Sequence, residues 1–459
     1  MGPMTKITPR GTRVTISPDL AHFSDNLRHF VSFDVTLRGE PDIIKLRFDI
    51  YSRSGHAANP RFCKLPKSEA LCTENVSLMK DWINLCDTSH SLCRNDTLPP
   101  LPSRIIDVES EPPKLLHSAS IDTRATYAAL SYTWGVPRAQ QYLTTIANET
   151  SHMSGMPLSE LPQIFRDAII ATRSLQLRYL WINAICIIQD SPTDVAEEIS
   201  QMLSIYENSY VTLSAASSKD CYTSFLQRES IRPPLVSFPQ RNKEGAFVDQ
   251  LYVYPQKERP AWTWDDIESS PWNQRAWTFQ ERLVSRRILH FTPYQIYFEC
   301  LSTDTSEIGD LPRIPLYETT SPKIFQSRYV GFFQHWNHML CQRGLTKADI
   351  DTIYQRYYFF VVDFSARHLS FNIDKAAAFS AVTRAADRLL KGRPVYGLWM
   401  DGLFEGLLWH ALGARTKENQ KIESYPSRSW FSQKGGVEIY SRRGIQNSDE
   451  WLPPDESTI

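Results

Sequence analysis

Three short apolar runs, separated by segments of helical period, constrain the fold of this chain most strongly. They cover residues 127–132, 179–188 and 210–215, and each is nearly continuous in apolar residues. Strands have this composition when both of their faces are buried, as in a parallel sheet whose connections are helices. The sequence therefore predicts an α/β domain with a doubly wound, mainly parallel sheet, in which these three strands are central and mutually parallel.

The two segments between these runs carry the signals of helices. Residues 161–175 open with Pro162 at a first-turn position and place apolar residues on one stripe. Residues 193–207 follow Ser191, which can cap a helix, and Pro192, which suits its first position. We expect both helices to cover the sheet and a binding crevice to lie at the carboxyl ends of the strands.

The rest of the chain suggests four regions. Alternating apolar residues over 31–37 and 46–50 predict a hairpin in a small N-terminal β unit, residues 1–70. Residues 71–125 read as a helix and a Pro-rich connector, and residues 126–300 as the α/β domain. The latter would include an irregular insertion over 216–271, a helix over 273–284 and a strand over 287–300. Residues 301–459 have a mostly helical pattern.

Charge and composition exclude several classes of protein. Fifty Lys and Arg against fifty-one Asp and Glu give a net charge of −1, which argues against a nucleic-acid binder. The longest apolar runs are far below the roughly 18 residues that cross a bilayer, and the N-terminal residues contain no secretory signal. We therefore expect a cytoplasmic protein without a membrane partner, and we expect its eight cysteines to be reduced.

Four ordered motifs carry a resemblance to a known family. They are YAALSYTWG at 127–135, LP at 161–162, YLWINAICIIQD at 179–190 and RAWTFQER at 275–282. In this order they resemble the fungal heterokaryon-incompatibility (HET) domain. The resemblance extends to the flanks, with W-x3-C-x3-H-x2-C at 82–93, YGLW at 396–399, LW at 408–409 and PSRSW at 426–430.

This resemblance implies a role in non-self recognition or programmed cell death signalling in a filamentous fungus. The HET domain is in turn similar to the flavodoxin-like fold of Toll/interleukin-1-receptor (TIR) domains. Some TIR domains hydrolyse NAD with a Glu on a Trp-Cys-x-x-Glu helix, so NAD is implied as a substrate and no resident cofactor is implied. The alternative is a non-catalytic signalling adaptor that assembles through homotypic HET-domain contacts, as a homo-oligomer or with other HET-domain proteins.

Two positions depart from the family pattern. Asn183 stands where the second strand of the family usually has Asp, and Arg428 replaces the first Trp of the C-terminal motif. If the charge of the Asp is needed for chemistry, this chain is weakened or inactive as an enzyme. The departure at Asn183 therefore favours the adaptor.

Glu281 is the candidate catalytic residue, and Trp277 is a candidate for ligand binding. They share the W-x3-E spacing of the TIR helix, and at i and i+4 they occupy one face of a helix. A carboxylate beside an aromatic wall is partly desolvated and could stabilise the cation that forms when an N-glycosidic bond breaks. The alternative is an ordinary helix-surface Glu281 that pairs with a neighbouring Arg.

Three further candidates for ligand binding follow the predicted strands. Trp134 could stack on a base or a nicotinamide ring, or could anchor its loop as a buried ring. Gly135 would allow a sharp turn or the close approach of a ligand. Asp190 could supply a polar ligand group or simply form a turn.

Cys86, His90 and Cys93 are weak candidates for metal ligands. With Cys72 upstream they offer enough soft ligands for a tetrahedral zinc ion, but the spacing is not that of a common zinc finger. Cys86 and His90 at i and i+4 could equally finish a helix. We expect the three side chains to lie within reach of one another without a metal.

Overall fold

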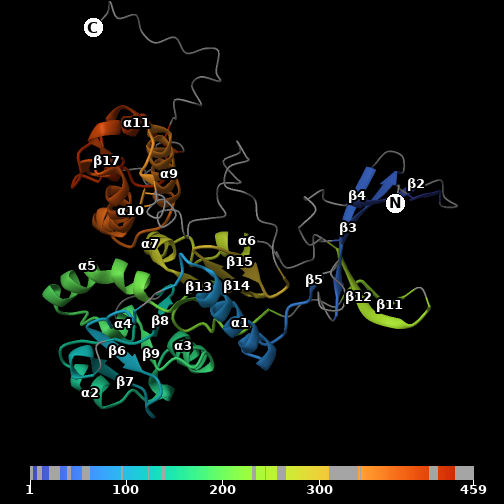
Figure 1. Cartoon of the computed structure of the whole chain (residues 1–459), viewed down its shortest axis with the longest axis horizontal. Coiled ribbons are helices and arrows are strands. Elements are labelled where there is room, and N and C mark those ends of the chain that lie inside the picture. The colour runs from blue at the N-terminus through green and yellow to red at the C-terminus, as the bar shows by residue number, and fades with distance from the viewer. Residues whose placement is uncertain are drawn as a thin grey trace, which may run out of the picture.

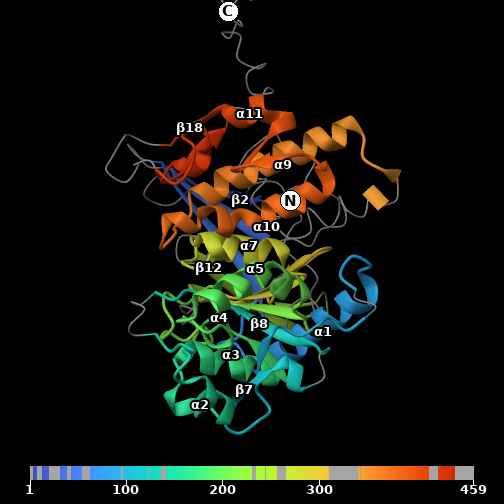
Figure 2. The ribbon, with the colours of Figure 1, turned by 90° about the vertical axis from the view of Figure 1, so that its left-hand side faces the viewer.

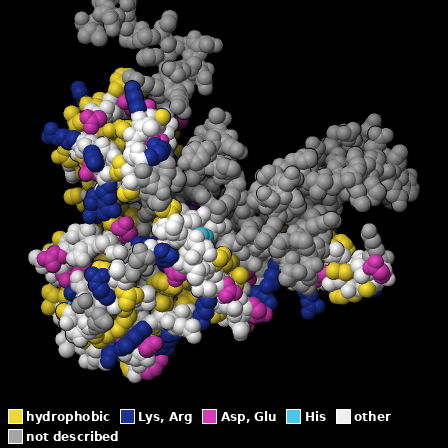
Figure 3. Space-filling view, in the orientation of Figure 1, with side chains coloured by type: hydrophobic (Ala, Val, Ile, Leu, Met, Phe, Trp, Pro, Cys, Tyr) yellow, Lys and Arg dark blue, Asp and Glu magenta, His cyan; other side chains and the backbone are white. Residues whose placement is uncertain are grey.

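The structure, a computed structural model, contains a central α/β sheet, a second sheet and a C-terminal group of helices (Figure 1). Basic and acidic side chains are interspersed on the described part of the face in Figure 3, in keeping with the nearly balanced charge. Within the described ranges, no helix combines the length and apolar character needed to cross a bilayer. The structure describes residues 4–7, 13–19, 31–38, 43–53, 63–94, 97–121, 124–135, 141–229, 234–242, 244–255, 265–309, 340–341, 343–412 and 422–439.

The central sheet has eight strands in the order β15-β14-β13-β10-β8-β9-β6-β7. Its middle strands β13, β10, β8 and β9 are parallel, and the outer strands pair antiparallel on both sides. The prediction that the three apolar runs form central, mutually parallel strands is confirmed. The strands are β6 (Arg104–Asp107), β7 (Lys114–His117), β8 (Tyr127–Ser131), β9 (Tyr179–Trp181), β10 (Val211–Ser214), β13 (Arg287–Phe291), β14 (Ile296–Cys300) and β15 (Asp304–Ser306).

Burial on both faces explains the composition of the middle strands. Every residue of β8, β10 and β13 is buried. In register, Ala128 of β8 lies opposite Val211 of β10 on one side and Leu180 of β9 on the other. Each buried aliphatic side chain of this kind stabilises the fold by about 1.5–3 kcal/mol. The apolar packing of these strands therefore holds the sheet and its helices together.

Two helices make the parallel connections and lie on opposite faces of the sheet (Figures 1 and 2). Helix α3 (Gln163–Ser174) connects β8 to β9, and α5 (Pro192–Asn208) connects β9 to β10, close to the predicted bounds. The predicted start of α5 is confirmed, because Ser191 accepts a hydrogen bond from the Asp194 backbone N–H and Pro192 takes the first position. Since β9 and β10 flank β8 on opposite sides, the winding direction reverses at β8.

Two predicted strands are wrong in length. The second strand ends at Trp181, and the short helix α4 (Asn183–Cys186) follows it. The ladder of β9 with β8 ends at Trp181 and its ladder with β6 ends at Leu180. An apolar run alone does not distinguish a strand from a buried helix. The single strand expected over 287–300 is the antiparallel pair β13 and β14, because Pro293 lacks a backbone N–H and Thr292 closes a turn onto the Gln295 carbonyl.

The second sheet has seven strands and draws on two distant parts of the chain. The predicted N-terminal hairpin is confirmed as the antiparallel pair β3 and β4. The expectation of an irregular insertion over 216–271 is wrong for residues 236–255, which form a hairpin that joins the sheet beside β4. The strands are β1 (Met4–Ile7), β2 (Arg13–Asp19), β3 (Val31–Arg38), β4 (Ile43–Ser52), β5 (Cys63–Lys64), β11 (Val236–Arg241) and β12 (Phe247–Pro255).

The described C-terminal residues pack on a helix of the α/β region. Figures 1 and 2 show α9 and α10 above α7, which lies beside α5. Their shared apolar core includes Phe279 of α7. The remaining elements are α1 (Thr73–Ser89), α2 (Glu149–Ser154), α6 (Asp265–Glu268), α7 (Ala276–Val284), α9 (Lys347–Ser365), α10 (Lys375–Leu390), α11 (Leu403–Leu407), and the short antiparallel pairs β16 (Pro394–Val395) with β17 (Leu398–Trp399) and β18 (Trp409–Ala411) with β19 (Val437–Ile439).

Phe279 is the side chain by which α7 holds the C-terminal helices. Its ring centroid lies 5.8 Å from those of Phe360 and Phe364 and 6.3 Å from that of Phe379. Replacing Phe279 with Ala should lower the free energy of unfolding by about 3–5 kcal/mol, because it leaves a cavity between two elements. Phe371→Ala is the control, since that ring is 68% exposed. Chemical denaturation compares the two, and similar small losses would contradict this packing.

Candidate functional site

A cavity of about 610 Å³ lies at the carboxyl ends of β8 and β9, where the sequence predicts the crevice. Residues 132–135, which follow β8, form one wall, and Asn183 and Gln189, which follow β9, lie nearby. Helix α5 contributes Ile199, Met202 and Tyr206. Gln141, the segment before α7, α7 itself and the C-terminal region complete the lining, with Pro271, Gln274, Arg275, Trp277, Glu281, His368, Ser370, Phe371 and Asp374.

Glu281 is buried at the inner side of this cavity, so the interpretation of a surface Glu is wrong. The Ser131 hydroxyl, at the end of β8, donates a hydrogen bond to its carboxylate. The Trp272 indole N–H donates to the same hydroxyl at 2.6 Å, which fixes the orientation of Ser131. A buried strand end and a buried indole therefore hold the carboxylate in place.

The environment of Glu281 changes its acidity. Burial raises the pKa of its carboxyl from 4.5 to about 6, although the Ser131 hydrogen bond and the charge of Arg275 act in the opposite direction. Such a group is largely ionised at pH 7 yet close to its titration range. Buried carboxyls of this kind are common in sites where charge develops during a reaction.

Arg275 brings a positive charge to the same cavity. It immediately precedes α7, and its guanidinium donates a hydrogen bond to the Tyr132 carbonyl at 2.7 Å. Burial lowers its pKa, and the charge of Glu281 raises it. In the sequence, Arg275 is the first residue of the RAWTFQER motif, and nothing in that pattern indicates a role in the site. The cavity therefore presents both a cationic and an anionic side chain to a ligand.

The structure brings both candidate tryptophans to the cavity. Trp277 and Glu281 line it from the same helix, as their spacing predicts. Trp134 lines it from the loop after β8 and stacks on Tyr132, with ring centroids 6.2 Å apart and planes 11° apart. Both indoles are half-buried, so each keeps part of its ring accessible to a ligand. Their role in ligand binding stays a prediction.

Gly135 also lines the cavity, but close packing against another part of the chain explains why glycine is needed there. Its φ of +71° lies in the left-handed region, and an added Cβ would lie 2.4 Å from the Cβ of Asp220. The backbone of residues 219–220 therefore lies against Gly135 and leaves no room for a side chain there. A side chain at this position would displace the loop that carries Trp134.

Asp190 is not part of the cavity lining, unlike its neighbour Gln189. Asp190 is exposed, and its carboxylate accepts a hydrogen bond from the Ile146 backbone N–H at 2.8 Å. This contact matches the turn-forming alternative. Gln189 instead donates its side-chain N–H to the Asn183 carbonyl at 3.0 Å, which joins two lining residues.

The sequence carries no signal for the cavity wall formed by residues 368–374. The His368 backbone N–H donates to the Gln274 carbonyl at 2.7 Å, and its carbonyl accepts from the Ala276 N–H at 3.0 Å. These bonds attach the loop between α9 and α10 to the start of α7. No local pattern indicates a contact across so long a stretch of chain.

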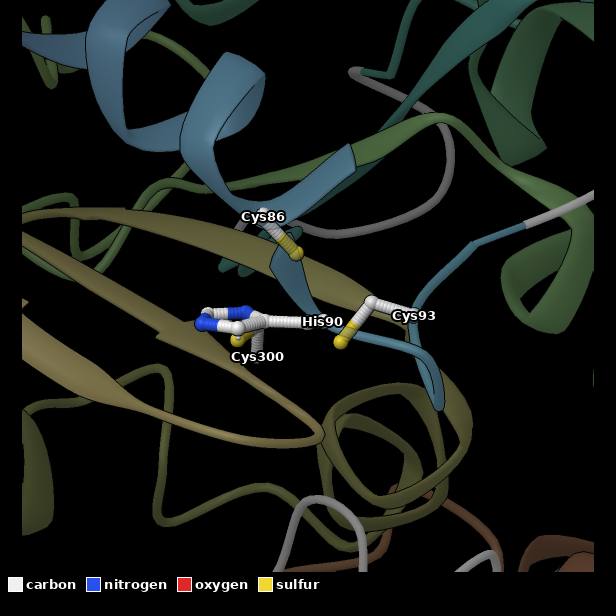
Figure 4. Close-up of side chains that lie close together, drawn as sticks. All are labelled: Cys86, His90, Cys93 and Cys300. Atoms are coloured by element: carbon white, nitrogen blue, oxygen red, sulfur yellow. Dashed lines mark hydrogen bonds between the residues drawn. The ribbon is translucent and has the colours of Figure 1, made fainter. Parts of the chain in front are cut away.

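The three weak metal candidates lie together, and the structure adds a fourth residue. Ligand atoms of Cys86, His90, Cys93 and Cys300 all lie within 4.8 Å of one another (Figure 4). Cys72, the fourth candidate considered from sequence, instead takes the position before the first residue of α1. Cys300 was not predicted because it lies 210 residues beyond His90 and carries no local signal.

Glu281→Gln should stabilise the folded chain above pH 6. Because the folded-state pKa of Glu281 is raised above 4.5, the folded chain binds this proton more tightly and the parent loses stability as pH rises from 4.5 to about 6. Gln does not titrate and can still accept the Ser131 hydrogen bond. At pH 7.5 the variant should unfold with a free energy up to about 2 kcal/mol higher, and the difference should shrink below pH 4.5.

Denaturant titrations over this pH range provide the measurement. Glu197→Gln, on the exposed side of α5, is the matched control and should show no such pH-dependent difference. If the parent is more stable than Glu281→Gln at pH 7.5, the fold stabilises the ionised carboxylate and the prediction is wrong.

A family match covers a segment that includes the strands β8, β9 and β10 and most of α7. Residues 127–281 match the family described as heterokaryon incompatibility protein (HET). Comparisons with curated proteins and with solved structures find no match. The matched segment begins at the first residue of β8 and ends at Glu281, so it includes the Trp134 loop, Asn183 and Trp277. Residues 127–281 are therefore identified as a HET domain.

Proposed function

We propose that this HET-domain protein acts in fungal non-self recognition that leads to programmed cell death, and that it does so by hydrolysing NAD. The family supports the biological role. The chemical role rests on one observation: the buried carboxylate of Glu281 lines a cavity with two half-buried indoles at the carboxyl end of a parallel sheet.

The proposed reaction consumes one water molecule. The bond between the ribose anomeric carbon and the nicotinamide nitrogen breaks, and its electron pair stays on the nitrogen, which neutralises the pyridinium. Water attacks the anomeric carbon, a proton is released, and ADP-ribose and nicotinamide leave. The ionised Glu281 stabilises the oxocarbenium character of the sugar, and a tryptophan face stacks on the departing ring.

The rest of the cavity supports a dinucleotide. Its volume of about 610 Å³ lies in the usual range for small-molecule sites, about 300–1,000 Å³. Arg275 offers a guanidinium for phosphate oxygens, since planar N–H donors suit that group. A carboxylate for the cationic sugar and a cation for the pyrophosphate therefore line one cavity.

The strand order supports a TIR-like ancestry for the site. In order of appearance along the chain, the parallel strands β9, β8, β10 and β13 have the spatial order 2-1-3-4. Flavodoxin-like sheets have this order, with their ligand at the point where the winding reverses. The cavity lies at the end of β8, the strand at which this sheet reverses. The antiparallel β14 replaces the fifth parallel strand of that order.

Asn183 is the observation that favours the second candidate function, a non-catalytic adaptor. It lines the cavity at the position where the family usually has Asp. If that charge takes part in the reaction, this chain signals instead by assembling with a second copy or another HET-domain protein. Asn183→Asp distinguishes the two proposals. If the chain is an adaptor, the variant should still not cleave NAD. If the chain is an enzyme that merely lacks the second carboxylate, the variant should cleave NAD faster than the parent.

Glu281→Gln should lower nicotinamide release from NAD by roughly a hundredfold to a thousandfold, since a lost electrostatic contribution of roughly 3–4 kcal/mol is typical. The parent rate should rise with pH through about 6, as Glu281 ionises. Chromatography of nicotinamide and ADP-ribose at high protein concentration, which promotes assembly, gives both results. Glu197→Gln on α5 is exposed and should match the parent.

The same substitution tests the biological role. Expressed in a fungal cell, Glu281→Gln should abolish toxicity at an unchanged protein level. If the Glu281→Gln protein kills as efficiently as the parent, toxicity does not depend on NAD hydrolysis at Glu281. If the parent also releases no nicotinamide while self-association persists, the adaptor is the correct function.

A further inference from the structure

Four side chains from three places in the sequence form a compact group beneath the sheet edge. Cys86 lies in the last turn of α1, His90 ends that helix, and Cys93 lies in the following turn. Cys300 is the last residue of β14. The three cysteines are buried, and Figure 4 shows the side chains of all four gathered in one space between α1, the turn and the strand.

We propose that Cys86, His90, Cys93 and Cys300 bind one structural zinc ion. Three thiolates and one imidazole are a common donor set for zinc, and four protein ligands leave no open position for a substrate. The expectation of a metal-free cluster rested on the uncommon spacing and on the alternative that Cys86 and His90 finish a helix, and it considered Cys72 as the fourth ligand where the structure has Cys300. The proposal is independent of NAD hydrolysis, because the group lies outside the cavity lining.

The distances suit a tetrahedral ion after a small contraction. Zinc lies about 2.3 Å from sulfur and about 2.0–2.1 Å from nitrogen, so its ligand atoms are about 3.3–3.8 Å apart. Here Nδ1 of His90 lies 3.4 Å from Sγ of Cys300, and all the ligand atoms lie within 4.8 Å of one another. Modest side-chain rotation brings the group to these separations.

Hydrogen-bond donors already surround two of the sulfur atoms. The backbone N–H groups of Ser302 and Thr303 donate to Sγ of Cys300 at 3.4 and 3.2 Å. The guanidinium of Arg287 donates to Sγ of Cys86 at 3.1 Å. Donors of this kind stabilise negative sulfur and orient metal ligands. Three thiolates with Zn²⁺ carry a net charge of −1, and the guanidinium of Arg287, which also pairs with Asp87, lies beside them.

Arg287 and the turn also hold the group in shape. A second guanidinium N–H of Arg287 donates to the Cys93 carbonyl at 3.0 Å. The Cys93 backbone N–H donates to the His90 carbonyl at 3.0 Å, which closes the turn between the two ligands. The backbone is therefore arranged around the ligands before any ion binds. A bound ion would fasten α1, from the segment before the HET domain, to β14.

The first test is the metal content of the protein purified without added metal or chelator. We expect one zinc ion per chain by elemental analysis. Removal with a strong chelator should lower the unfolding temperature, and added zinc should restore it, because a ligand that binds only the folded state stabilises that state. Metal-free protein that shows no change in unfolding temperature with added zinc would overturn the proposal.

Ligand substitutions locate the ion. Cys93→Ser and Cys300→Ser should each lose the zinc, whereas Cys72→Ser, at the opposite end of α1, should keep it. If the ligand variants fail to fold, Co²⁺ bound to the parent provides a separate readout through the charge-transfer absorption of its thiolate ligands and the intense visible bands of a tetrahedral site. Absence of both bands when Co²⁺ is added to the reduced, metal-free parent would reject the site.

Discussion

The burial of α7 between the sheet and the C-terminal helices is the constraint on which the rest of the structure depends. On its apolar side, Phe279 packs among the rings of α9 and α10. On its other side, Arg282 is almost fully buried and pairs with Glu299 of β14 at 2.9 Å and with Glu268 of α6 at 2.8 Å. A buried guanidinium without partners would cost several kcal/mol, so these pairs fix the rotation of the helix.

That rotation determines the chemistry of the cavity. With Arg282 held toward Glu299, the preceding residue Glu281 meets the end of β8, where Ser131 donates to it. The C-terminal region takes part as well, because Arg367 donates to the Asn273 carbonyl at 2.5 Å beside the loop that carries His368. The same contacts that attach the C-terminal helices to the HET domain therefore close one side of its cavity.

The sequence predicts those features that depend on local periodicity, and misses those that depend on distant contacts. Apolar runs predicted the parallel strands, and the i, i+4 spacing placed Trp277 with Glu281, because both patterns repeat within one element. The end of β9 at Trp181 was missed because a continuous apolar run does not distinguish a strand from the buried helix α4 that follows it. Cys300 and the His368 wall were missed because the partners of both lie far away in the chain.

The proposed binding of NAD in the cavity at Glu281 is tested most directly by a structure of the Glu281→Gln protein determined with NAD. We expect the nicotinamide ring against Trp134 or Trp277, the anomeric carbon beside residue 281 and the pyrophosphate toward Arg275. The substitution preserves the shape of the side chain, so the ligand should remain uncleaved in place. NAD bound at another surface, or an empty cavity at saturating NAD, would contradict the account.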